Sequence, residues 1–103
     1  MTEWIKVCAL EEIPAQGSRV VASRQGDIAI FRTATDTVFG LHDKCPHKGG
    51  PLSQGMVHGE TVTCPLHNWK IGFKDGEAAA PDKGCAKTFA VKLDAGFVWL
   101  QLH

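Results

Sequence analysis

The sequence predicts a small all-β domain, and three observations support this. Its 103 residues are about the length of one domain. Val, Ile, Thr, Phe and Trp, which favour strands, gather in short blocks that Gly, Asp and Pro separate. Within the blocks the apolar residues alternate or form short runs, and no longer segment repeats them at helical spacing. We therefore expect a single domain over residues 1–103, without an internal repeat or linker.

Taken in chain order, the blocks predict strands joined by tight turns. The expected strands are Trp4–Leu10, Arg19–Ser23, Ile28–Arg32, Val38–His42, Thr61–Cys64, Lys70–Phe73, Phe89–Leu93 and Phe97–Leu102. Between them, Gln25-Gly26-Asp27, Asp75-Gly76 and Asp94-Ala95-Gly96 supply residues that tolerate positive φ. The segment Leu10–Pro14 predicts one helical turn, which ends because Pro14 cannot continue a helix.

The composition excludes several classes of function. An apolar content of 44% with 21% charged residues is ordinary for a globular protein and too apolar for a disordered one. Eleven basic and eleven acidic residues give a formal charge of zero, so we expect no nucleic-acid partner. No apolar run approaches the length of a spanning helix, and residues 1–4 lack the features of a signal peptide. We therefore expect a cytoplasmic protein without a membrane partner.

Two segments interrupt the strand pattern in the middle of the chain. Residues 43–57 are rich in Gly and Pro and poor in strand formers, and a second such break, residues 64–72, begins at Cys64. Long irregular segments inside a small domain are usually functional, or are held by something other than backbone pairing. We expect both segments to be binding loops.

Each break carries one cysteine and one histidine, in the pattern C-x-H-x16-C-x2-H. The four residues are Cys45, His47, Cys64 and His67. Two thiolates and two imidazoles on proline-stiffened loops are a plausible ligand set for one metal centre, whereas disulfides are disfavoured in a cytosolic chain. A structural zinc site usually groups Cys with Cys and His with His. The mixed order here favours a two-iron cluster, with both thiolates on one iron and both imidazoles on the other, and zinc is the alternative.

The two loops resemble a known family. Residues 45–52, Cys-Pro-His-Lys-Gly-Gly-Pro-Leu, and residues 64–69, Cys-Pro-Leu-His-Asn-Trp, are similar to the cluster-binding boxes of Rieske [2Fe-2S] proteins. Over residues 3–102 the chain further resembles the small subunits of assimilatory NADH-dependent nitrite reductases. That wider likeness rests on Trp4…Val7-Cys8, on Ile28–Arg32 and on Gly76-Glu77-Ala78…Pro81-Asp82…Gly84-Cys85.

The resemblance implies a Rieske fold, a β-sandwich with a small cluster-binding subdomain formed by the two loops. It implies a Rieske [2Fe-2S] cluster held by Cys45, His47, Cys64 and His67, and electron transfer without a catalytic residue of its own. The implied partner is a large nitrite reductase subunit that carries FAD, another iron–sulfur cluster and sirohaem and reduces nitrite to ammonia. A free-standing Rieske ferredoxin that serves a ring-hydroxylating dioxygenase is the alternative, and a zinc-stapled interaction module is a third possibility.

Four positions near the boxes indicate a low reduction potential. Gly50 and Leu66 stand where high-potential Rieske proteins have a disulfide, so the expected cluster alone joins the loops. Trp69 and Ile71 stand where those proteins place hydroxyl groups near the cluster sulfurs. Fewer hydrogen bonds to sulfur stabilise the reduced state less, which predicts a potential in the lower half of the roughly −150 to +300 mV Rieske range.

The remaining polar residues give weaker signals. Lys44, Lys48, Lys70 and Lys74 oppose only Glu60 within residues 44–74, a local charge of +3 that either orients an acidic partner or is merely solvated. Neither Cys8 nor Cys85 completes a ligand pair, so we expect both to be buried thiols outside the centre. We expect the other histidines, His42, His58 and His103, at the surface or at strand ends.

Overall fold

The computed structural model describes residues 3–24, 26–45, 49–65, 68–79 and 84–102. In these ranges strands dominate, and the only helices are two short 3-10 turns. The elements are β1 (Glu3–Ala9), η1 (Leu10–Glu12), β2 (Ser18–Val21), β3 (Ile28–Arg32), β4 (Val38–His42), η2 (Leu52–Gln54), β5 (Met56–His58), β6 (Thr61–Thr63), β7 (Lys70–Gly72), β8 (Thr88–Phe89), β9 (Val91–Asp94) and β10 (Phe97–Leu102). The predicted all-β class is therefore confirmed.

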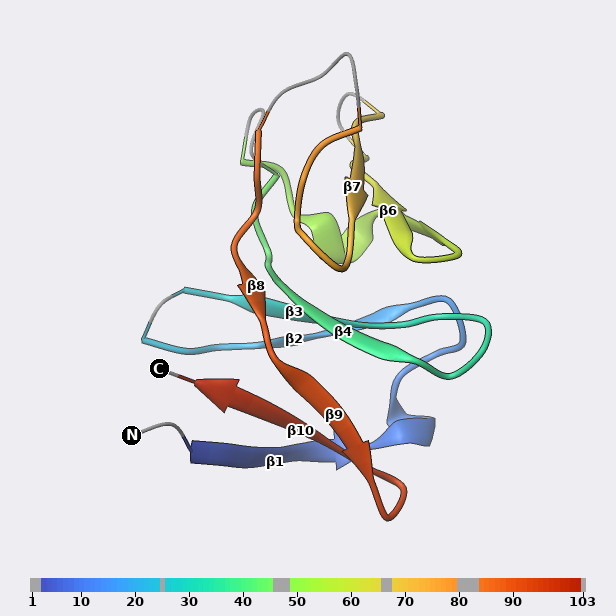
Figure 1. Cartoon of the computed structure of the whole chain (residues 1–103), viewed down its shortest axis with the longest axis vertical. Helices are drawn as coiled ribbons and strands as arrows, with labels where there is room; N and C mark the ends of the chain where they lie inside the picture. The colour runs from blue at the N-terminus through green and yellow to red at the C-terminus, as the bar shows by residue number, and fades with distance from the viewer. Residues whose placement is uncertain (1–2, 25, 46–48, 66–67, 80–83, 103) are drawn as a thin grey trace.

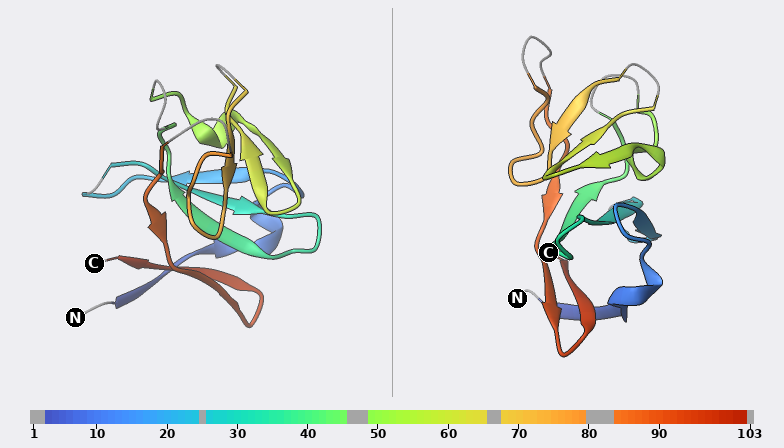
Figure 2. Two further views of the ribbon diagram at one scale, coloured as in Figure 1. Left: turned by 45° about the horizontal axis from the view of Figure 1, so that its top comes forward. Right: turned by 90° about the vertical axis from the view of Figure 1, so that its right-hand side faces the viewer.

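The strands form three antiparallel sheets stacked in layers (Figure 1). Sheet A has the order β1-β10-β9, sheet B the order β2-β3-β4-β8, and sheet C the order β5-β6-β7. Sheet B lies in the middle, with sheet A on one side and sheet C on the other, and Figure 2 shows the same order from two other directions. Sheets A and B make the sandwich, and sheet C belongs to the smaller subdomain.

The central position of sheet B explains the composition of β3. Ile28, Ala29, Ile30 and Phe31 are all buried, because both faces of this strand are covered. Ile28 and Ile30 point into the core between sheets A and B, while Ala29 and Phe31 point into the core between sheets B and C. Because side chains alternate along a strand, β3 contributes residues to both cores.

We call these two cores the lower and the upper core. The lower core joins sheets A and B and consists of Cys8, Ile13, Ile28, Ile30, Val38, Phe89, Val98 and Leu100. The upper core joins sheets B and C and consists of Ala29, Phe31, Leu41, Cys45, Leu52, Val57, Val62, Cys64, Ile71, Phe73 and Ala86. Cys45 and Cys64 therefore lie in the upper core, and the lower core is built without them.

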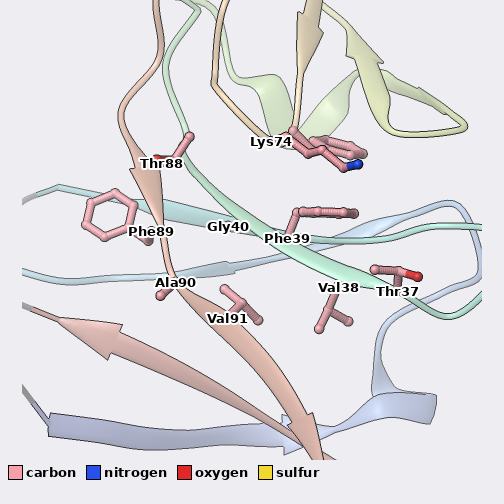
Figure 3. Close-up of a pocket in the computed structure, with 10 residues that line it drawn as sticks. Thr37, Val38, Phe39, Gly40, Lys74, Thr88, Phe89, Ala90 and Val91 are labelled. Carbon is pink, nitrogen blue, oxygen red and sulfur yellow. The ribbon is translucent and has the colours of Figure 1, made fainter.

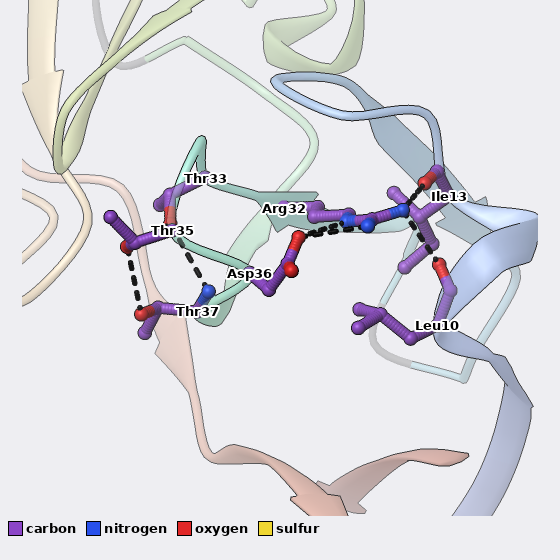
Figure 4. Close-up of polar contacts among 7 residues, drawn as sticks. All are labelled: Leu10, Ile13, Arg32, Thr33, Thr35, Asp36 and Thr37. Carbon is purple, nitrogen blue, oxygen red and sulfur yellow. Dashed lines mark hydrogen bonds and ion pairs between the residues drawn. The ribbon is translucent and has the colours of Figure 1, made fainter. Parts of the chain in front are cut away.

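An arginine ties η1 to the β3–β4 hairpin (Figure 4). The Arg32 Nη1 donates to the carbonyl oxygens of Leu10 (3.3 Å) and Ile13 (2.8 Å), while its Nε and Nη2 both lie 2.8 Å from Oδ1 of Asp36. These bonds fix the carbonyls of the first residue of η1 and of the residue that follows this short helix, and they hold Ile13 in the lower core. The predicted helical turn at Leu10–Pro14 is confirmed as η1.

Strand bounds agree with the sequence predictions in part, and β1, β2, β6 and β7 differ from them by one or two residues at one or both ends. The predictions for β3, β4 and β10 match their bounds, but the single strand expected over Phe89–Leu93 is divided into β8 and β9. The division falls at Ala90, because Phe89 pairs with Gly40 in sheet B and Val91 pairs with Leu100 in sheet A. In the described part of the chain, no helix is long and apolar enough to cross a membrane.

The segment expected as a loop over residues 43–57 also contains regular structure. It includes η2 and β5, both of which the sequence analysis missed. The strand β5 has only three residues, which are too few for the sequence to reveal the alternation, although Val57 is buried between two exposed residues. Its pairing with β6 across the turn at Gly59–Glu60 is what makes it a strand.

Candidate metal centre

The first candidate loop begins just after β4. Cys45 is 2% exposed and lies three residues beyond the end of that strand. Its N–H donates to the carbonyl oxygen of Gly50 (2.8 Å), and its own carbonyl oxygen accepts from the N–H of Gly49 (2.8 Å). Gly49 has φ +73°, a left-handed conformation that glycine adopts without steric cost. These contacts form a tight corner around Cys45.

The second candidate loop begins directly after β6. Cys64 is 1% exposed, and its N–H donates to the carbonyl oxygen of Trp69 (2.7 Å). Its carbonyl oxygen accepts from the N–H of Asn68 (3.0 Å), which has φ +59°. Asn is among the few residues other than glycine that enter this left-handed region readily. A corner of the same kind therefore surrounds Cys64.

The two corners share one backbone scaffold. In each, the cysteine N–H donates to the carbonyl oxygen of the fifth residue after it, and the cysteine carbonyl oxygen accepts from the N–H of the fourth. This fourth residue has a left-handed backbone conformation. The predicted ligands His47 and His67 lie outside the described residues. In sequence, His47 follows its cysteine by two positions and His67 by three. The two corners therefore share their backbone geometry, while the sequence places the two histidines at different spacings.

The donor chemistry of the described residues fits a site that needs two thiolates. All four cysteines of the chain lie in the described ranges, and none forms a disulfide. Cys45 and Cys64 are buried together in the upper core, each on its own corner. Within the described residues no group of three or more metal-binding side chains is complete, because the other two predicted ligands fall outside them.

The apolar residues beside the second corner act mainly as packing. Trp69 is partly buried and packs against the upper core, and Ile71 is fully buried in it. Gly50 is buried and closes the first corner through its carbonyl. Leu66, the position that matches the second disulfide cysteine of high-potential relatives, lies outside the described residues. At the second corner, positions 69 and 71 therefore carry packed apolar side chains in place of hydroxyl groups.

Two features of the loops escaped the sequence analysis. One is the left-handed Asn68, which a search for Asn or Gly four residues after each cysteine finds. The other is a contact across the first loop, in which the Asp43 carboxylate accepts from both the N–H and the hydroxyl of Ser53. No local sequence signal reveals that contact, because its partners are ten residues apart.

The predicted lysines lie at the surface where the structure describes them. Lys44, Lys70 and Lys74 are exposed, and Lys48 lies outside the described residues. The Lys74 Nζ is 3.1 Å from the Glu60 Oε1, so this exposed pair neutralises itself. Glu60 therefore offsets the charge of Lys74 and does not offset the charges of the exposed Lys44 and Lys70.

The remaining cysteines and histidines differ in part from expectation. Cys8 is buried, as predicted, and burial raises the pKa of its thiol. Cys85 was expected to be buried but is exposed, because it follows the exposed Gly84 and only the next residue, Ala86, enters the upper core. His42 ends β4 and His58 ends β5, as expected, while His103 lies outside the described residues.

A hollow of about 540 Å³ lies between β4, the β8–β9 segment and the turn after β7 (Figure 3). It is lined by Thr37, Val38, Phe39, Gly40, Phe73, Lys74, Thr88, Phe89, Ala90 and Val91. Its lining contains no thiol, imidazole or carboxylate, and Glu60 already pairs with its one cation. The hollow therefore offers no metal-binding side chain, unlike the two cysteine corners.

Comparison with known proteins connects this geometry to a family. The Rieske [2Fe-2S] domain family matches residues 3–90. The chain is 36% identical over 85 residues to the 4β-methylsterol monooxygenase of Methylococcus capsulatus, covering 72% of this chain but 23% of that protein. It is 30% identical to the ferredoxin component of the naphthalene 1,2-dioxygenase system of Pseudomonas aeruginosa, covering 99% of each.

A solved structure shares the fold over the whole chain. A protein assigned as an NADH-dependent nitrite reductase small subunit from Mycobacterium tuberculosis superimposes with a TM-score of 0.88 at 18% identity, covering 100% of this chain and 97% of that one. The curated relatives are of two sizes, since the chain spans about a quarter of the monooxygenase and nearly all of the ferredoxin. From the family match and the paired cysteine corners, we conclude that this chain belongs to the Rieske [2Fe-2S] domain family, whose cofactor is a Rieske-type [2Fe-2S] cluster.

Proposed function

We propose that this chain is the electron-transfer small subunit of an NADH-dependent nitrite reductase, which converts nitrite to ammonia. The observation that carries the proposal is the segment after β7, where Gly76-Glu77-Ala78 and Gly84-Cys85 resemble those subunits. Gly76 has φ +72°, and a Cβ there would overlap the carbonyl oxygen of Ala86, so the position requires glycine. At Gly76, one of the residues that carry the resemblance, the backbone geometry therefore explains why the residue is glycine.

This segment lies beside the second cysteine corner. The N–H of Ala79 donates to the carbonyl oxygen of Lys70 (2.8 Å), one residue after Trp69 closes the corner. Ala78 pairs with Ile71, and Glu77 pairs with Cys85. The part of the sequence that most resembles nitrite reductase subunits is thus at the redox end of the molecule, where a partner protein must approach to receive an electron.

In this proposal residues 1–103 form one Rieske domain, with cluster-binding loops over about 43–57 and 64–72. The thiolates of Cys45 and Cys64 hold one iron, and the imidazoles of His47 and His67 hold the other. The cluster, when bound, supplies one-electron transfer. The chain's own residues fix the thiolates on rigid corners and surround them with the apolar upper core, which limits the access of water.

The proposed partner is a large subunit that carries FAD, another iron–sulfur cluster and sirohaem, and that binds nitrite. The described residues form two sandwiched cores and no nucleotide-binding fold, so in this proposal the domain passes its electron to a partner that binds nitrite. The exposed Lys44 and Lys70 lie close in sequence to the two corners and offer an acidic partner surface an orienting charge.

A second candidate has an observation of its own. The 30% identity to the naphthalene dioxygenase ferredoxin extends over 99% of both chains. This favours a free-standing carrier that donates electrons to a ring-hydroxylating oxygenase. Both candidates use the same cluster and differ only in the protein that docks on it.

Reconstitution separates the two. The purified chain is mixed with the large sirohaem flavoprotein, and ammonia formed from nitrite with NADH is measured; in parallel, hydroxylation by a ring-hydroxylating oxygenase with its reductase is measured. We expect ammonia formation to require this chain. Full activity of the large subunit alone, or support of the oxygenase instead, would overturn the assignment while leaving the cluster in place.

The lysines provide a second arm of the same experiment. We expect the double reversal Lys44→Glu and Lys70→Glu to weaken pairing with the large subunit, with a smaller loss at high salt because screening removes the contribution of the charges. The double reversal Arg24→Glu and Lys92→Glu, at exposed basic residues of the β2–β3 turn and of β9, changes the net charge by the same amount and is the matched control, which should leave pairing unchanged. Equal losses in both variants would mean that net charge alone matters.

A further inference from the structure

The two cysteine corners are closed on their outer side by different means. At the second corner, β6 and β7 pair immediately outside the loop, with Thr63 opposite Lys70. At the first corner β4 ends at His42, and the chain after Gly50 enters η2 instead of a strand. The first loop therefore lacks the backbone ladder that fixes the second.

A side-chain clasp occupies the corresponding place in the first loop. The N–H of Ser53 donates to the Asp43 Oδ1 (2.7 Å), and the Ser53 hydroxyl donates to the Asp43 Oδ2 (2.8 Å). Both carboxylate oxygens are thus bound to one residue across the loop. Hydrogen bonds to an ionised acceptor are about twice as strong as neutral ones, and both residues are partly shielded from water.

The clasp is fixed to sheet B at both of its ends. The Asp43 N–H donates to the carbonyl oxygen of Asp27 (2.8 Å), at the start of β3. The Ser18 hydroxyl, on β2, donates to the carbonyl oxygen of Ser53 (2.6 Å). The two ends of the first loop are therefore held both to each other and to the sandwich.

We infer that Asp43 is a positioning residue for the first cluster loop, which replaces the missing strand pair by joining its ends through Ser53. This inference rests on the proposed role of Cys45 as a ligand. Opening the clasp removes the direct link between the two ends of the first loop, so the loop spreads and the Cys45 thiolate is less well placed. The second corner keeps its ladder and is unaffected.

A purely structural role is the alternative, since Ser53 belongs to η2 and the Asp43 carboxylate accepts the backbone N–H of this second residue of the short helix, as a helix cap does. The two roles differ in what they change. Loss of a helix cap lowers overall stability. Loss of a positioning residue changes the first loop selectively, which appears in the release of iron and in the reactivity of Cys45 relative to Cys64.

The test compares Asp43→Ala, Asp43→Asn and Ser53→Ala with the matched control Asp75→Ala. Asp75 also accepts a backbone hydrogen bond through its carboxylate, from the Glu77 N–H (3.0 Å), but lies outside the segment that the clasp closes. Three quantities are measured on each purified protein: the rate of iron loss to a chelator, the ratio of Cys45 to Cys64 alkylation by peptide mass spectrometry, and the thermal unfolding midpoint.

We expect Asp43→Ala to release iron about tenfold faster and to raise the Cys45 to Cys64 alkylation ratio by a similar factor, the size of effect that loss of such bonds produces. Asp43→Asn keeps an acceptor for the Ser53 N–H and gains a donor toward its hydroxyl, so it should stay within about twofold of wild type. The double variant Asp43→Ala/Ser53→Ala should equal Asp43→Ala, because Asp43→Ala already removes both hydrogen bonds of the clasp.

Two results would overturn the inference. One is an alkylation ratio for Asp43→Ala equal to that of wild type. The other is equal changes in Asp43→Ala and Asp75→Ala that follow the unfolding midpoint. The alkylation ratio is also measured on the iron-free protein, so a wild-type protein without a cluster would refute the proposed function while the ratio still decides the role of Asp43. If Asp43→Ala does not fold, Ser53→Ala, which removes the hydroxyl bond and keeps the N–H bond, supplies the comparison with a smaller expected rise in the alkylation ratio.

Discussion

The two cysteine corners have one backbone geometry but are supported in different ways. Around both Cys45 and Cys64 the same pair of hydrogen bonds closes the same turn. Outside the turn, the second loop continues into the paired strands β6 and β7, whereas the first is closed by the side chains of Asp43 and Ser53. A backbone ladder supports one thiol and a carboxylate clasp supports the other. Only the clasp can be removed by a single side-chain substitution.

The largest expected effect comes from removing a cysteine from either corner. Cys45→Ser and Cys64→Ser should each reduce iron and sulfide from about two of each per chain to nearly none. Because the lower core contains neither cysteine, hydrogen exchange in β1 and β10 should stay slow while sheet C exchanges faster. His58→Ala, at an exposed strand end, is the control. Full iron content in either serine variant would contradict the proposed ligand set.

The next effect comes from the left-handed residues of the two corners. Gly49→Val and Asn68→Val should each cost about 1–2 kcal/mol, because a β-branched side chain fits this region poorly. Asn68→Gly should be close to neutral, since it keeps the backbone conformation that the corner requires. The measurement is the thermal unfolding midpoint of the iron-loaded protein. Similar losses for Asn68→Gly and Asn68→Val would mean that the Asn68 side chain matters and not its φ.

Much of the architecture follows from local sequence. The bounds of β3, β4 and β10 could be predicted because each is a run of strand-forming residues that ends in a turn or polar segment. The division at Ala90 could not, because it depends on which sheet each half meets. The strand β5 and the helix η2 depend in the same way on partners elsewhere in the chain.

For the site, the sequence predicts residue types better than geometry. Their spacing and flanking prolines predict that Cys45 and Cys64 belong to one site, and the structure places both in the upper core. The exposure of Cys85 was not predictable, because one residue further on the chain turns inward at Ala86. The Asp43 clasp was equally hidden, since nothing near Asp43 in sequence identifies Ser53 as its partner.

The four cysteines should differ in reactivity, which sharpens the contrast between corner and surface thiols. In the folded protein, iodoacetamide should modify Cys85 first, because it is exposed, and Cys8 only after unfolding. We expect a rate difference of at least about 100-fold, since access to a buried thiol requires an opening that costs several kcal/mol. Peptide mass spectrometry over time measures this. Early modification of Cys8 would contradict its placement in the lower core.

The smallest expected effect is a pH dependence that arises from Cys8. Burial raises the pKa of its thiol, so the folded protein retains this proton at pH values where the unfolded chain has lost it. The free energy of unfolding should therefore decrease as pH rises above about 8.5, the ordinary value for a thiol. Cys8→Ala should remove this decrease, and Cys85→Ala should not. Urea denaturation between about pH 7 and 10 compares the slopes, and an unchanged slope in Cys8→Ala would exclude the thiol as its cause.

The central claim is that each loop contributes one thiolate and one imidazole to a single cluster. Pulsed paramagnetic resonance of the reduced protein, grown with 15N-labelled histidine, tests it most directly. We predict hyperfine coupling to two histidine nitrogens, with one lost in His47→Ala and the other in His67→Ala if either variant retains its cluster. A paramagnetic cluster without any histidine coupling, or stoichiometric zinc in protein from iron-replete cells, would contradict the account.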